Sequence, residues 1–132
     1  MPLLNPSFVA HADIAPAVFC KRYTSADNTV VLATDGSAPI AGVTHNGTCR
    51  APVSGVTALA AKAGEGVVVH GEGDTAEVVV GSADLGAGVA VTADSSGHAV
   101  VATAGYIGGY TLAAGKATGK VKIQVLPQQL NA

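Results

Sequence analysis

The chain has 132 residues, a net charge of −2, and 48% hydrophobic residues of which few are aromatic, so its length fits one domain built from small side chains. Charged residues make up 12%, about half of the usual quarter, and the seven Lys and Arg are scattered, which excludes the basic stripe of a nucleic-acid-binding protein. A mean hydropathy of +0.42 with low net charge also excludes intrinsic disorder.

Residues 1–16 contain three prolines, which disfavour a central strand. We therefore expect an extended N-terminal arm whose apolar side chains lie on a neighbouring subunit or another partner. The expected interface residues are Leu3, Leu4, Phe8, Val9 and Ile14. The segment has no basic region followed by a long apolar core, so it does not resemble a signal peptide. No run of 18 apolar residues follows that could span a membrane.

Short runs of alternating apolar and polar residues predict nine strands in an all-β domain over residues 17–127. Gly- and Asp-containing turns separate them every 8–12 residues, as in a small β-barrel or β-sandwich. The predicted strands cover 18–23, 29–33, 40–44, 67–70, 77–80, 89–92, 99–102, 107–111 and 121–126. One short helix is predicted over 56–63, capped by Ser54, and residues 128–132 are predicted to be a frayed tail.

The two halves of the domain repeat one pattern. Residues 19–23, 30–33 and 40–43 are apolar runs separated by turns, and 89–93, 100–102 and 107–110 follow the same order. Each half then passes through an Ala- and Gly-rich stretch into a last strand. The pattern predicts two similar β-meanders folded against each other.

The densest polar cluster is His70-Gly71-Glu72-Gly73-Asp74, followed by Glu77. Alternate residues of an extended chain face the same side, so His70, Glu72 and Asp74 could converge on a metal ion. The glycines on both sides of Glu72 instead favour a solvated hairpin tip. His11 with Asp13, and the lone His45 and His98, are interpreted as ordinary surface residues, and no metal or cofactor is expected.

The sequence offers no activated nucleophile. Cys20 and Cys49 are too few for a disulfide framework and are interpreted as reduced thiols. There is no Gly-x-Ser-x-Gly turn, and neither Gly64-Glu65-Gly66 nor Gly71-Glu72-Gly73 has the context of a phosphate-binding loop. We therefore expect no catalytic residues and no enzyme activity.

Several segments resemble the tailed-phage capsid decoration proteins, the small head cement proteins. Residues 42–52 fit the pattern G-V-x-x-x-G-T-x-x-A-P of that family, and the likeness continues in order to Pro127. It includes segments 69–74, 77–81, 85–89, 92–100, 108–115 and 120–127. The chain departs from the family at Gly86-Ala87-Gly88 and at His98, both in turns.

The resemblance implies a β-rich structural protein without catalytic residues that lies on the outer surface of an icosahedral phage head. It implies that the major capsid protein is the partner, that the protein forms a homotrimer, and that it is made in the host cytoplasm. The function predicted is stabilisation of the shell by bridging neighbouring capsid subunits. The alternative is a surface carbohydrate-binding or adhesion module, for which sugar-stacking aromatics would have to come from Tyr23, Tyr106 and Tyr110.

Overall fold

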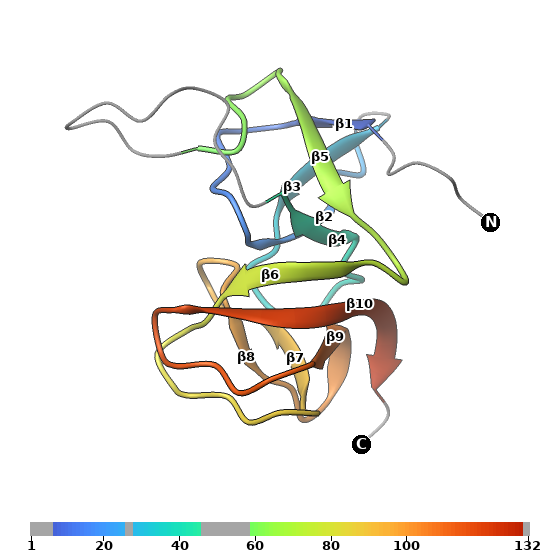
Figure 1. Ribbon diagram of the computed structural model, residues 1–132. Coiled ribbons are helices and arrows are strands. Elements are labelled where there is room, and N and C mark those ends of the chain that lie inside the picture. The colour runs from blue at the N-terminus through green and yellow to red at the C-terminus, as the bar shows by residue number, and fades with distance from the viewer. Residues whose placement is uncertain (1–6, 26–27, 46–58, 131–132) are drawn as a thin grey trace, which may run out of the picture.

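The computed structural model describes residues 7–25, 28–45 and 59–130. Every regular element among these residues is a strand, and the strands form two five-stranded sheets (Figure 1). Within these ranges no helix is long and apolar enough to cross a membrane. The ten strands are β1 (Ser7–Ala10), β2 (Phe19–Arg22), β3 (Thr29–Leu32), β4 (Gly42–Thr44), β5 (Gly66–His70), β6 (Thr75–Val79), β7 (Ala90–Ala93), β8 (Ala99–Val101), β9 (Gly105–Thr111) and β10 (Lys120–Leu130).

The first five strands form a closed barrel in the order β1-β3-β2-β4-β5, which we call the N-terminal barrel. β1 closes it by pairing in parallel with β3 and antiparallel with β5, so the N-terminal barrel has no open sheet edge along β1. The inward side chains are small or β-branched, with Phe8 and Ile14 the largest apolar contributions from the first sixteen residues. This core depends on many well-packed small groups because the chain has few aromatic residues.

The other five strands form the C-terminal sheet, in the order β6-β10-β9-β7-β8. β10 lies at its centre, paired antiparallel with β6 on one side and with β9 on the other. A parallel bridge between Val80 and Ala99 brings the end of β6 beside β8, so the sheet curls toward closure as the N-terminal barrel does.

The expected repeat of two similar halves is confirmed by the strand order. Strands β3-β2-β4-β5 and β8-β7-β9-β10 are connected in the same way. The likeness extends to single hydrogen bonds: the carboxylate of Asp13 accepts the N–H of Ala63, and the carboxylate of Asp84 accepts the N–H of Ala117. The backbone at Ala17 and at Gly88, the equivalent residues before β2 and β7, is left-handed in both halves.

The two sheets share a hydrophobic core, so they pack as one body (Figure 1). Phe19 and Val43 from the N-terminal barrel are buried together with Val78, Val91 and other residues of the C-terminal sheet. The ring of Phe19 lies directly over Gly108 of β9, where a Cβ atom would come within 2.2 Å of it. One face of the N-terminal barrel, made by β2 and β4, is therefore covered by the second sheet.

The all-β fold and all nine predicted strands are confirmed, with shifts of no more than two residues at every end except that of β10, which runs on from the predicted residue 126 to Leu130. The predicted N-terminal arm is wrong for the described residues 7–16. Residues 7–10 form β1, and Ile14 pairs with Ala61. The prolines that suggested an arm flank β1 at positions 6 and 16 and do not interrupt it.

Two further expectations about the ends of elements need correction. The prediction of a frayed tail from residue 128 is wrong for residues 128–130. Gln128, Gln129 and Leu130 belong to the long strand β10 and pair with β9. Of the predicted helix, Ser54 and residues 56–58 lie outside the described residues. Residues 59–63 contain no helix, and Ala61 forms the bridge to Ile14.

Candidate functional site

Of the five predicted interface residues, Leu3 and Leu4 lie outside the described residues. Phe8 and Ile14 are buried, with only 6% and 3% of their surface exposed, and belong to the core of the N-terminal barrel. They are therefore not available for contact with another subunit. Val9, between two inward-facing residues of β1, points outward and is 39% exposed.

Val9 belongs to a strip of outward-facing valines on the side of the N-terminal barrel away from the C-terminal sheet. Val68 of β5 is 44% exposed and lies diagonally from Val9, which pairs with Gly66. Val31 of β3 is half-buried and points outward because its neighbour Val30 is fully buried. We call these three residues, Val9, Val31 and Val68, the valine strip, and it crosses three adjacent strands, β5, β1 and β3.

The sequence reasoning missed Val31 and Val68, although the signal was present. Residues 67–69 are three consecutive valines in a strand, and alternation requires the middle one to face away from the other two. On a barrel face that no other sheet covers, the outer member is then exposed.

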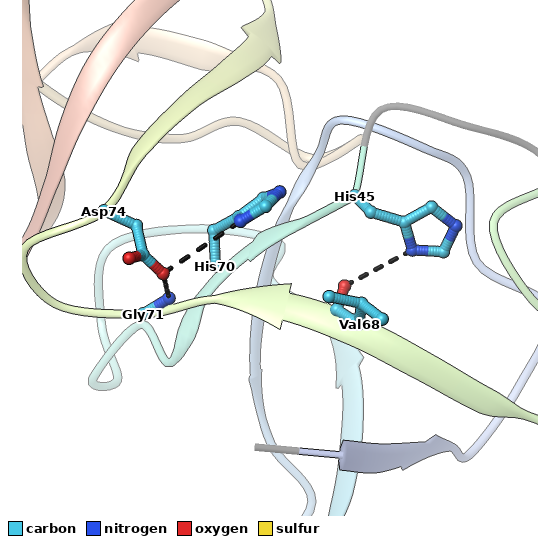
Figure 2. Close-up of polar contacts among 5 residues, drawn as sticks. All are labelled: His45, Val68, His70, Gly71 and Asp74. Atoms are coloured by element: carbon cyan, nitrogen blue, oxygen red, sulfur yellow. Dashed lines mark hydrogen bonds and ion pairs between the residues drawn. The ribbon is translucent and has the colours of Figure 1, made fainter. Parts of the chain in front are cut away.

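The polar cluster at His70 adopts a turn between the two sheets (Figure 2). The carboxylate of Asp74 accepts the N–H of Gly71 at 3.0 Å and lies 4.0 Å from Nδ1 of His70. Glu72 is exposed at the tip. The carboxylate of Asp74 thus closes the turn, and among the described residues no group of three or more His, Cys, Asp or Glu is placed to hold a metal ion.

The remaining histidines make contacts in different parts of the molecule. The ring of His45 reaches the carbonyl oxygen of Val68 at 3.4 Å (Figure 2). The ring of His11 stacks on Tyr23, with ring centres 3.8 Å apart. His98 lies in the β7–β8 turn, where its N–H donates to the carboxylate of Asp94. These contacts hold turns and strands in place.

Cys20 is fully buried in the N-terminal barrel, and Cys49 lies outside the described residues. Burial raises the pKa of the Cys20 thiol to about 12, and a backbone hydrogen bond with Gly42 offsets only part of that rise. A buried thiol with a raised pKa is inert as a nucleophile at neutral pH. Cys20 is part of the core.

The tyrosines of the carbohydrate-binding alternative are engaged in local contacts. One face of the Tyr23 ring is covered by His11, and the hydroxyl of Tyr110 accepts a hydrogen bond from the side-chain amide of Gln128 at 2.9 Å. Tyr106 lies on the same strand as Tyr110, four residues earlier.

The described surface also has a groove beside the end of β2. A cavity of about 280 Å³ lies between Lys21, Arg22 and Thr24 on one side and Ala38, Pro39 and Ile40 on the other. We call it the Arg22 groove. A second hollow of about 440 Å³ shares Lys21, Arg22, Thr24 and Ala38 with this groove and is also lined by Val31 of the valine strip. The guanidinium of Arg22 lies 5.7 Å from the centre of the Phe8 ring, which positions the charge over the end of the N-terminal barrel.

A comparison with solved structures finds the same fold in a phage protein. The crystal structure of the N-terminal base of the head fiber gp8.5 of bacteriophage phi29 superposes with a TM-score of 0.55, and the match covers 96% of each chain at 14% identity. No family model matches the sequence, and no curated protein matches it. At this identity the likeness is one of fold, and it extends over both five-stranded sheets.

Proposed function

We propose that this chain is a structural virion protein that binds the outer surface of an icosahedral phage head and stabilises the shell by bridging neighbouring major capsid subunits. The observation that supports it most is the fold, which matches a phage head fiber base over nearly the whole chain. The resemblance of several turns to head decoration proteins points the same way. No catalytic role is proposed.

The architecture suits a structural role. Two sheets joined by a shared core give a rigid body, and no buried side-chain nitrogen or oxygen among the described residues lacks a hydrogen-bond partner. A rigid clamp holds two shell subunits in a fixed relation at a smaller entropic cost than a flexible one.

The valine strip is the surface that we propose for contact with the shell or with another copy. It presents β-branched side chains on a barrel face that the second sheet leaves uncovered. Burying one such side chain fully stabilises a contact by roughly 1.5–3 kcal/mol, so even partial burial of three would matter. We also propose a homotrimer, because a symmetric ring of three copies uses the same two complementary surfaces at each of its three interfaces. No copy is then left with an unpaired contact surface.

The test compares a double charge substitution in the valine strip with a single charge substitution outside it. Val9→Glu combined with Val68→Glu should abolish co-sedimentation of the protein with heads that lack it. Leu112→Glu is the control, because Leu112 is 52% exposed but lies outside the valine strip. Equal binding by both variants would reject the valine strip as the contact, and failure of the wild-type protein to bind any head would reject the proposed function.

Oligomeric state is measured separately, by light scattering of the purified protein and of protein released from heads. A mass three times that of the chain is expected in both. A monomer in both samples would reject the trimer while leaving head binding to the sedimentation experiment.

A further inference from the structure

The Arg22 groove lies where β2 and β4 separate. The two strands pair at Phe19 with Val43 and at Cys20 with Gly42, and in the described part of the chain the pairing extends no further toward Arg22. Ile40 and Pro39 turn away and form the opposite wall of the groove. The end of β2 therefore has a neighbouring strand on one side, β3, and a groove on the other.

The main chain of Arg22 faces this groove. On β2, the N–H of Tyr23 donates to Thr29 of β3 and the carbonyl of Phe19 accepts from Ala33, so residues 19, 21 and 23 use their main-chain groups toward β3. Val18 and Cys20 instead accept from Thr44 and Ala41, on the β4 side. By the same alternation the N–H and C=O of Arg22 point into the groove.

The C-terminal sheet shows what such a groove can hold. At the equivalent place, where β7 and β9 separate, the turn at Gly36 of the N-terminal barrel occupies the space. The carbonyl of Gly36 accepts the N–H of Tyr106 at 2.9 Å, and a Cβ atom on Gly36 would lie 2.9 Å from the hydroxyl of Thr92. The equivalent groove of this fold thus binds a segment of main chain through a hydrogen bond to the strand.

The two grooves differ in charge and in the donor that they offer. Lys21 and Arg22 stand where the C-terminal sheet has Thr92 and Ala93, and Pro39, which has no N–H, stands where it has Tyr106. The main-chain donor in the first groove must therefore come from Arg22. The pKa of Asp35 is lowered chiefly by the hydrogen bonds from Ser37 and to a smaller extent by the charge of Lys21. Because Lys21 already interacts with this carboxylate, Arg22 supplies the positive charge for a ligand.

We propose that the Arg22 groove binds an extended segment of a partner protein that carries a carboxylate. The segment adds alongside β2, bonded to the main chain of Arg22, and its carboxylate pairs with the guanidinium. The apolar surfaces of Ala38 and the exposed Pro39 receive a small apolar neighbour of the acidic residue. This inference does not depend on the head-binding role, because the groove would recognise such a segment in any partner.

The experiment is a titration of the purified, ¹⁵N-labelled full chain with a capped peptide of alternating Thr and Val with one central Glu. The amide resonances of Arg22, Thr24 and Ala41 should shift and saturate. The same peptide with Gln in place of Glu should bind roughly fivefold more weakly, the effect of one partly exposed ion pair. Absence of shifts at these amides would overturn the proposal.

Three variants identify the groove and the charge. Arg22→Gln should remove the difference between the Glu and Gln peptides, whereas Lys122→Gln, at an exposed lysine of β10, should preserve it. Ala38→Phe fills the groove without changing its charge and should abolish binding of both peptides. Thermal unfolding checks that each variant is folded, because Arg22 also contacts Phe8.

Two other occupants give different results. If inorganic phosphate reproduces the shifts while the Gln peptide causes none, the groove is a simple anion site. If the shifts appear on raising the protein concentration without peptide, the occupant is a second copy of this chain. Either result would overturn the proposal of an acidic partner segment.

Discussion

Thr111 repeats in the second half of the molecule the hydrogen bonds that Thr44 makes in the first. The hydroxyl of Thr44 accepts the N–H of Val18 at 3.1 Å and donates to the carbonyl of Ala15 at 2.9 Å. The hydroxyl of Thr111 accepts the N–H of Val89 at 3.0 Å and donates to the carbonyl of Gly86 at 2.7 Å. Both side chains are buried, so each half uses a threonine to satisfy the backbone before its first meander strand.

Substitution of either threonine by valine should destabilise the protein by about 1–3 kcal/mol, because a backbone N–H and a backbone C=O in buried or part-buried hydrogen bonds each lose their partner. The two variants should be affected alike if the halves are equivalent. Urea denaturation measures this, with Thr103→Val at an exposed turn as the control that should stay within about 0.5 kcal/mol. Wild-type stability of Thr44→Val would show that its hydroxyl is not needed.

Phe8 distinguishes a strand of the N-terminal barrel from a detached arm. Because only 6% of the surface of Phe8 is exposed, Phe8→Ala should reduce the free energy of unfolding by about 3–5 kcal/mol. Val9→Ala, one residue further along, should change it by less than about 0.5 kcal/mol. Equal and small effects of the two variants would mean that β1 contributes nothing to the barrel.

Gly108 tests the contact between the two sheets. A Cβ atom there would lie 2.2 Å from the ring of Phe19, which is fully buried and cannot move aside freely. Gly108→Ala should therefore cost about 1–3 kcal/mol by overpacking. Gly86→Ala is the control, since nothing lies within 4 Å of its Cβ position.

Adding Phe19→Leu to Gly108→Ala should recover part of that loss, because the smaller side chain makes room for the new methyl group. Strictly additive effects of the two substitutions would mean that Phe19 and Gly108 do not touch.

The strands could be predicted from the sequence because their signal is local. Val- and Thr-rich alternation bounded by Gly or Asp identified nine of them, and the repeated pattern indicated the two halves. β1 was missed because a four-residue strand flanked by prolines resembles an extended linker, and only its long-range partners, β3 and β5, distinguish the two. Pairing with strands that lie 20 and 57 residues further along the chain leaves no mark in a local pattern.

The candidate surfaces were harder to predict, for the same reason. Val9 and Val68 are separated by 59 positions in the sequence and meet only because β1 closes the N-terminal barrel beside β5. The Arg22 groove depends on where β2 and β4 stop pairing, which is set by the path of the chain at Pro39 and Ile40. Residue types alone identified only the dense polar cluster at His70, where the carboxylate of Asp74 accepts the N–H of Gly71.

Stability should fall with rising pH in a way that depends on Cys20. The pKa of its thiol is about 12 in the folded chain, above the ordinary 9.0, so the folded state keeps a proton that the unfolded chain releases. The stabilisation is complete below pH 9 and is lost progressively as the pH rises toward 12. Urea denaturation between pH 7 and pH 10.5 should show this decline in Cys49→Ser but a smaller one in Cys20→Ala combined with Cys49→Ser. Parallel declines in both proteins would exclude Cys20 as the cause.

Phage heads that lack this protein should release their DNA at a lower temperature than heads that carry it. Packaged DNA presses outward on the shell, and a protein that touches two subunits at once binds the assembled state in preference to the separated one. By mass action it then stabilises each site by about 2.7 kcal/mol at a hundredfold excess over its dissociation constant. The contacts proposed for the valine strip are apolar, so this protection should persist when salt is raised. The measurement is DNA release on heating, monitored with a dye that intact heads exclude. It compares undecorated heads alone, undecorated heads with added wild-type protein, and undecorated heads with the Val9→Glu and Val68→Glu double variant. Equal release temperatures for decorated and undecorated heads would show that the protein binds without strengthening the shell, and an adhesion role would then explain its presence better.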